Sequence, residues 1–242
     1  MQMSRALAGA AVVLALLFGG WFTLRSDPDN TLTITFQARS GRDTLVFDEF
    51  VYANPGGDGE YRLRDFRFYL SNVHLIGDSK TFAEPDSYHL IRFDNSDRAH
   101  SLKFAGLPLR SVEKVRFMLG LDAEANSSIE FRGDLDPNSQ MAWNWEVGYK
   151  FLVFEGGLLS DGEVVPLVYH VGFTENSRML EFSIPEGLVL QDDAELRFDV
   201  DVAKLFDGQT IIDMAATQSV KFDREDAKML ADNYANMIEV AF

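Results

Sequence analysis

Short runs of alternating apolar and polar residues dominate the sequence. In residues 31–36, for example, Leu32, Ile34 and Phe36 alternate with threonines. Alternation with a period of two is typical of a β-strand that buries one face. Comparable runs occupy residues 65–76, 88–93, 114–119, 141–154, 164–173, 179–184 and 196–202. The pattern therefore predicts about eight or more short strands.

Turn-forming residues separate these runs, and Asp161-Gly162 gives the clearest hairpin. A two-residue hairpin turn needs positive φ at both central positions, which Asp-Gly tolerates. A helical period appears only near the C-terminus, where Asp223 can cap a helix. Its apolar positions recur at three- and four-residue spacing, at Ala227, Leu230, Ala231, Tyr234, Met237 and Ile238. Many strands, few helices and no βαβ rhythm predict an all-β fold, an antiparallel β-sandwich with a C-terminal helix, over residues 31–242.

Residues 1–26 differ from the rest of the chain. Arg5 precedes residues 6–24, which carry no charge, and Arg25 follows them. This arrangement is typical of an export signal, and as a helix the uncharged segment would span about 28 Å of a membrane. The segment is therefore either a signal peptide or a membrane anchor. Both place the domain of residues 31–242 outside the cytoplasm, free in the periplasm or tethered to the membrane facing it.

Composition narrows the classes of function. The formal net charge of −16 at pH 7 repels phosphate backbones, which argues against nucleic acid as a partner and favours cations or basic proteins. The absence of cysteine excludes disulfides, thiolate nucleophiles and zinc–thiolate sites. No G-x-S-x-G, H-E-x-x-H or P-loop motif occurs. The sequence therefore favours a binding protein over an enzyme.

An aromatic run within residues 141–154 is the most unusual feature of the chain. If this run is one extended strand, Trp143, Trp145 and Tyr149 share a face. The ordinary interpretation is a row of core aromatics. The polar residues between them, such as Glu146, and the acidic loop before them favour instead a place at the rim of a site.

Asp134-x-Asp136-x-Asn138, just before the aromatic run, is similar to the first half of a calcium loop. The twelfth position holds Trp145 instead of a bidentate Glu, so a turn whose Asp side chains bond their own backbone is favoured. Structural calcium is the alternative. A hydrolase is disfavoured, because paired acid and base carboxylates face each other about 5–9 Å apart across a cleft.

The four histidines are His74, His89, His100 and His170, and no two of them share a metal-ligand spacing on one element. Any metal site must therefore be assembled across strands. His170 shares its strand face with Gly172, whose missing side chain would let a ligand or an indole approach. Taken alone, a single histidine is more often an ordinary half-exposed polar residue.

Four segments together carry a resemblance to a known family: DFRFYLSNVHLI (65–76), FMLGLDAEAN (117–126), GDLDPNSQMAWNWEVGYKFLVFEG (133–156) and YHVGF (169–173). The run W-x-W-x-x-G-Y-x-F-x-x-x-E-G and the later His-x-Gly are specific in combination. The chain resembles the MbnP-like family of methanobactin-associated periplasmic copper-binding proteins over nearly all of residues 31–242.

The resemblance implies a β-rich periplasmic copper-binding protein. In this family a tryptophan of the W-x-W motif is oxidised to kynurenine by a di-haem, peroxidase-like partner, and the new aryl amine joins histidine imidazoles around copper. On this basis Trp143 or Trp145 is the modified residue and His170 is a copper ligand. The expected function is copper acquisition, storage or delivery, without enzymatic activity.

The chain departs from the family pattern on its first strand. Thr35, Gln37 and Ala38 stand where a histidine is expected, so a second imidazole would come from elsewhere, with His74 as the candidate and His89 and His100 as alternatives. The other class of function is a carbohydrate- or protein-binding module. It would use unmodified Trp143, Trp145 and Tyr149 for stacking, hold structural calcium and bind no copper.

Overall fold

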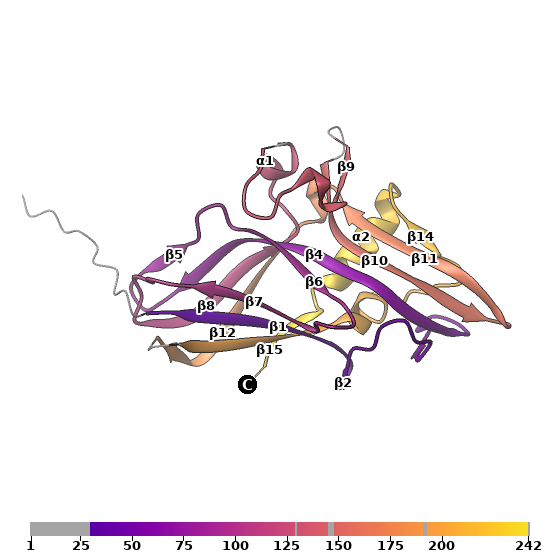
Figure 1. The fold of residues 1–242 in the computed structure, drawn as a ribbon, viewed down its shortest axis with the longest axis horizontal. Helices are drawn as coiled ribbons and strands as arrows, with labels where there is room; N and C mark the ends of the chain where they lie inside the picture. The colour runs from indigo at the N-terminus through magenta and orange to yellow at the C-terminus, as the bar shows by residue number, and fades with distance from the viewer. Residues whose placement is uncertain (1–29, 129, 145–147, 191–192, 242) are drawn as a thin grey trace, which may run out of the picture.

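The computed structural model describes residues 30–241 except residues 129, 145–147 and 191–192. Two β-sheets pack face to face, as the strand pattern predicts (Figure 1). The smaller sheet has the order β15-β13-β1-β2, and β7 also pairs with β1. Its strands are β1 (Leu32–Ser40), β2 (Asp43–Thr44), β7 (Ala99–Phe104), β13 (Ala194–Asp201) and β15 (Ile238–Ala241).

The larger sheet has the order β12-β8-β4-β10-β11-β14, and four short strands pair with it at the side. Its main strands are β4 (Glu60–Ile76), β8 (Ser111–Leu119), β10 (Gly148–Ser160), β11 (Glu163–Gly172), β12 (Arg178–Val189) and β14 (Ser219–Val220). The side strands are β3 (Tyr52–Ala53), β5 (Thr81–Ala83), β6 (Tyr88–Phe93) and β9 (Ala142–Asn144).

Most strand pairs are antiparallel, and β1 pairs in parallel with β13. The Asp161-Gly162 hairpin is confirmed, since both residues have positive φ, 52° and 80°, and Ser160 pairs with Glu163. This turn fixes the register of β10 against β11. Counting back along both strands, Val153 lies opposite His170.

Strand β4 is the centre of the larger sheet. Along one edge it pairs first with β10 and then with β8, and along the other edge it pairs with β6. One cross-strand row therefore runs from β6 through β4 and β10 to β11, in the order Arg92, Arg67, Val153, His170.

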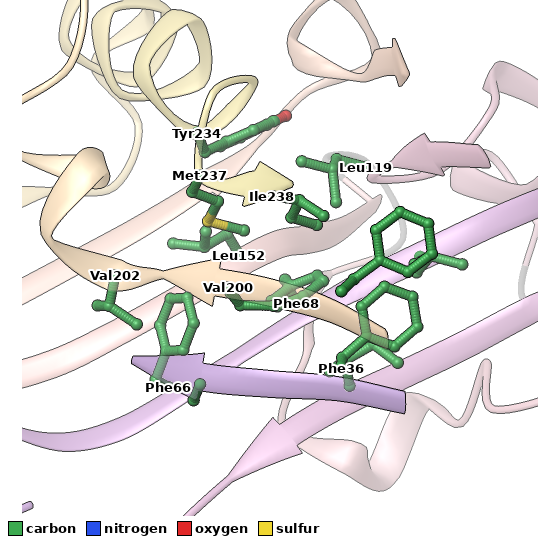
Figure 2. Packing of buried hydrophobic residues seen from close by; sticks show 14 of the residues in the cluster. Phe36, Phe66, Phe68, Leu119, Leu152, Val200, Val202, Tyr234, Met237 and Ile238 are labelled. Atoms are coloured by element: carbon green, nitrogen blue, oxygen red, sulfur yellow. The ribbon is translucent and has the colours of Figure 1, made fainter. Parts of the chain in front are cut away.

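The main core lies between the inner faces of the two sheets (Figure 2). The alternation in β1 buries Leu32, Ile34 and Phe36, as the sequence predicts. The ring of Phe36 stacks on that of Phe198 at a centroid distance of 5.4 Å and meets the edge of Phe117 at 5.9 Å. Aromatic residues from both sheets therefore hold the sandwich together.

Residues 120–128 and 130–144, the covering segment, cross the outer face of the larger sheet (Figure 1). The segment contains α1 (Ala123–Asn126), the 3-10 helix η1 (Pro137–Ser139) and β9. It buries a second apolar cluster against β4, β6 and β10, whose residues are Tyr69, Tyr88, Leu121, Ala125, Leu135, Met141, Tyr149, Phe151 and Val153. The larger sheet is therefore covered on both faces at this point.

The C-terminal helix α2 (Arg224–Tyr234) begins as predicted, with Asp223 accepting hydrogen bonds from the backbone of Glu225 and Asp226. It packs against β11. The helix is shorter than its apolar spacing predicts, because the chain turns after Tyr234 and Ile238 enters β15, where it pairs with Val200 of β13. Short 3-10 helices also occur at η2 (Thr174–Asn176) and η3 (Val202–Leu205).

The expected signal peptide or anchor, residues 1–26, lies outside the residues that the structure describes. Within the described residues no helix is both long and apolar enough to cross a membrane.

Candidate functional site

The aromatic run is a hairpin, and the single strand predicted for residues 141–154 is wrong. Asn144 pairs with Gly148 and Ala142 with Tyr149, so β9 folds back antiparallel on β10. Gly148 makes this reversal feasible, because its φ of 86° is favourable only for glycine. Trp143 lies on β9, whereas Trp145 lies in residues 145–147, outside the described part of the chain.

The indole of Trp143 lies over the backbone of Gly172. A Cβ atom placed on Gly172 would come 2.5 Å from Cζ3 of this indole, so only glycine leaves room for it. The expectation that Gly172 lets an indole approach is confirmed. The indole also contacts two phenylalanine rings, that of Phe173 at a centroid distance of 5.5 Å and that of Phe222 at 5.1 Å.

Phe173 holds a strained backbone conformation beside this indole. Its φ of 67° is rare for a bulky residue and costs on the order of 1–3 kcal/mol. The buried Asn176 supports the turn by donating from Nδ2 to the carbonyl of Gly172 at 2.8 Å. The guanidinium of Arg224 lies 4.3 Å from the centre of the Phe173 ring. These contacts fix the aromatic side of the site.

His170 lies on the outer face of β11, two residues before Gly172, and is only 8% exposed. Its Nε2 lies 2.9 Å from Oε1 of Glu155 on β10. Burial lowers the pKa of His170, and Glu155 opposes this shift. A neutral imidazole that donates from Nε2 to the carboxylate keeps Nδ1 as an acceptor or metal ligand.

Arg67 and Lys150 hold the covering segment onto the sheet beside His170. The Arg67 guanidinium donates from Nη1 to the carbonyl of Ser139 at 3.1 Å and from Nη2 to Asp65 at 2.7 Å. Lys150 donates from Nζ to the carbonyl of Gln140 at 2.7 Å. The site is therefore a charged patch on the sheet face, partly covered by the covering segment, whose strand β9 carries Trp143.

The structure does not bring His74 to His170. His74 lies seven positions beyond Arg67 on β4, which is roughly 20 Å along a strand, and Nδ1 of its ring lies 2.9 Å from the carbonyl of Asn72. His89 pairs with Glu84 at 2.7 Å. His100 lies on β7.

The first-strand positions are also remote from His170. Thr35 and Gln37 alternate with the core residues of β1 and so lie on the outer face of the smaller sheet, on the other side of the sandwich. Among the described residues no group of three or more His, Cys, Asp or Glu could hold a metal ion.

The carboxylates of the DxDxN motif bond to nearby backbone. Asp136 accepts from the backbone N–H of Asn138 at 2.8 Å and caps η1, and Asp134 accepts from the N–H of Leu90 at 2.9 Å. The Asp136 contact is the turn that the sequence favours over a calcium loop, whereas Asp134 bonds to β6 and not to its own turn.

The lowered pKa of His170 predicts a measurable effect of pH. Unfolded, the ring binds a proton near its ordinary pKa of 6.5, whereas the folded protein binds it only at lower pH. The unfolded state therefore holds more protons in that window, and stability falls as pH falls from 6.5 through the lowered pKa. An NMR titration of the imidazole should give a pKa below 6.5, and Glu155→Gln should lower it further. A higher pKa in the variant would contradict the role given to Glu155.

Sequence reasoning missed Glu155, Phe173 and Phe222 as parts of the site. Glu155 could have been predicted from the sequence, because the register set by the Asp161-Gly162 turn places it diagonally beside His170 on the same face. Phe222 is far from the aromatic run in sequence, and no local pattern connects the two.

These observations define a two-sheet β-sandwich whose larger sheet carries a covered site on its outer face. The family model MbnP matches residues 29–223, and the chain belongs to the MbnP family. The structure is similar to that of MbnP from Methylosinus trichosporium, with a TM-score of 0.55, 17% sequence identity and 81% of each chain covered. At this identity the likeness shows a shared fold. A search of curated proteins found no match.

Proposed function

We propose that the protein is a non-enzymatic copper-binding protein, exported to the periplasm or tethered to the membrane facing it, that serves copper acquisition, storage or delivery. The observation that carries the proposal is the hydrogen bond between His170 and Glu155, since His170 is two residues before the glycine on which the Trp143 indole lies. Metal-binding histidines commonly donate their second ring N–H to a carboxylate, which orients the ring and raises its basicity. Nδ1 of His170 is then the nitrogen that would hold copper.

The chemistry of the available donors supports copper in part. A neutral imidazole suits copper, and Glu155 supplies a carboxylate beside it. Since the described residues offer no group of three conventional ligands, a further donor is required. Oxidation of Trp143 or Trp145 to kynurenine, by a di-haem peroxidase-like partner, would add an aryl amine. The Trp143 indole lies against Gly172, which is two residues after His170 in β11.

Copper titration of His170→Ala tests the proposal. We expect the variant to lose the copper site, and Glu155→Gln to bind copper roughly 10–100-fold more weakly, as is usual for the loss of a ligand-orienting partner. The control is His89→Ala, which removes another histidine paired with a glutamate. Unchanged stoichiometry and affinity in His170→Ala would remove His170 from the site.

The copper titration should use protein purified from the organism that naturally produces it, where the partner oxidase would be present. Peptide mass spectrometry over Trp143 and Trp145 would then identify the mass change of an indole converted to kynurenine.

A second candidate is a binding module for a carbohydrate or a protein. It is favoured by the exposed ring of Phe222, 59% accessible, which packs on Trp143. Such a ligand would stack on these two rings and leave Trp143 unmodified. His170→Ala would then leave ligand binding intact, so the two candidates give opposite results with one variant.

A further inference from the structure

A hollow of about 600 Å³ lies on the outer face of the larger sheet, beside the His170 site. Three arginines line it, Arg64 and Arg67 from β4 and Arg92 from β6, together with residues 138–140 of the covering segment. This concentration of positive charge is unusual in a chain with a formal net charge of −16. The local arrangement of the strands must therefore bring these arginines together.

Strand pairing places the arginines together. Arg67 and Arg92 lie directly opposite each other on β4 and β6, where Cβ atoms are about 4.5–5.5 Å apart and like charges are destabilising. Arg64 reaches the same face through a β-bulge, because Asp65 pairs with Glu155 and Leu63 with Gly156, which leaves Arg64 as the extra residue. The sheet thus holds three like charges against their mutual repulsion.

The two carboxylates in the hollow do not neutralise all three arginines. Asp65 pairs with Arg67, and Oδ1 of Asp94 accepts hydrogen bonds from the backbone of Ser96 and Asp97. Within the part of the chain that the structure describes, Arg64 and Arg92 have neither an ion pair nor a side-chain hydrogen bond. Hydrogen bonds from Ser96 lower the pKa of the Asp94 carboxyl, and attraction to Arg92 helps to lower it. However, no hydrogen bond among the described residues uses the guanidinium donors of either arginine, so both can still donate to an anion.

The Arg67 side chain is already held in a fixed position at the edge of the hollow. It is 5% exposed, held by its bonds to Ser139 and Asp65, and its buried Nε has no hydrogen-bond partner among the described residues. A guanidinium fixed in this way keeps donors to spare and loses little freedom on binding a ligand.

We propose that this hollow is a binding site for a small anion that carries a phosphate or a carboxylate group. Arginine forks match both groups with two parallel hydrogen bonds. Because the molecule as a whole repels anions, binding here would depend on these three side chains and not on general attraction. Only β10 separates Arg67 from His170 in the cross-strand row, yet the site needs no copper and stands independently of the proposed function.

The test is isothermal titration of the full chain with inorganic phosphate and, separately, with succinate, at constant ionic strength. We expect saturable binding of at least one anion, and the stronger of the two identifies the ligand class. Arg64→Gln and Arg92→Gln should each weaken it about tenfold, equivalent to about 1.4 kcal/mol. Arg42→Gln is the matched control, since it removes the same charge from an exposed turn outside the hollow.

The outcome is decisive in either direction. Binding that weakens equally in Arg42→Gln, or no saturable binding of either anion, would overturn the proposal. Thermal unfolding in the absence of anion tests whether the variants are folded. Because Arg64 and Arg92 are exposed, their replacement should leave the unfolding midpoint unchanged or raise it. Added anion should raise the midpoint of the wild type more than that of the variants.

Discussion

Replacing Gly172 by alanine should lower the free energy of unfolding by about 2 kcal/mol and displace Trp143, because a new methyl group overpacks the site. The new Cβ would lie 2.5 Å from the indole and 2.7 Å from the carbonyl oxygen of Tyr149. The indole can move, but the carbonyl belongs to β10, so the pairing of β10 with β11 must also adjust. Copper affinity should fall in the same variant if Trp143 or its product supplies a donor.

Urea unfolding and tryptophan emission would measure the two effects of Gly172→Ala. Gly157→Ala is the matched control in β10, since its Cβ would meet neighbours only at 3.4 Å and beyond, which is ordinary contact. The control should change stability by less than about 1 kcal/mol. Equal stability and emission in Gly172→Ala and the wild type would mean that the indole does not rest on this glycine.

Replacing Asn233 by alanine should cost about 3 kcal/mol or more. The side chain of Asn233 is fully buried in α2, where Nδ2 donates to the carbonyls of Leu205 and Thr210 and Oδ1 accepts from the N–H of Thr210. Truncation leaves the buried carbonyl of Leu205 without a partner, which costs about 1–3 kcal/mol, and removes two bonds to the exposed Thr210, each worth about 0.5–1.5 kcal/mol. This one amide therefore ties Leu205, the last residue of η3, and Thr210, which lies between η3 and β14, to α2.

Chemical denaturation would compare the free energies of unfolding of the two single variants Asn233→Ala and Asn236→Ala, and the difference would isolate the effect of burial. Asn236 is exposed and donates to the carbonyl of Asp232, so its loss should cost only a few tenths of a kcal/mol to about 1 kcal/mol. A similar cost for both variants would show that water replaces the bonds of Asn233.

The fold was largely predictable because its signals are local. Leu32, Ile34 and Phe36 alternate with threonines, and the Asp161-Gly162 turn contains the two residues that the hairpin requires. The end of α2 was less predictable. Ile238 continues the helical spacing, but its pairing in β15 with Val200 of β13 outweighs the local preference.

The site was harder to predict because its geometry depends on reversals and register. The alternation of residues 141–154 gave no sign that Gly148 would adopt positive φ and fold β9 back, which is how Trp143 comes to lie over Gly172. The pairing of Arg67 with Arg92 depends on how β6 aligns with β4. Such contacts between distant segments leave no periodic trace in the sequence.

The parallel pairing of β1 with β13 has a consequence for how the chain folds. Thr31 and Asp193, at the start of this pair, share a hydrogen bond although they are 162 residues apart. β1 can pair early with β2 and β7, but the smaller sheet cannot be completed until β13 and β15 are available. Because pairings between distant segments form slowly, the apolar face of β1 stays exposed during folding. Aggregation from this early strand is then a hazard during production of the protein.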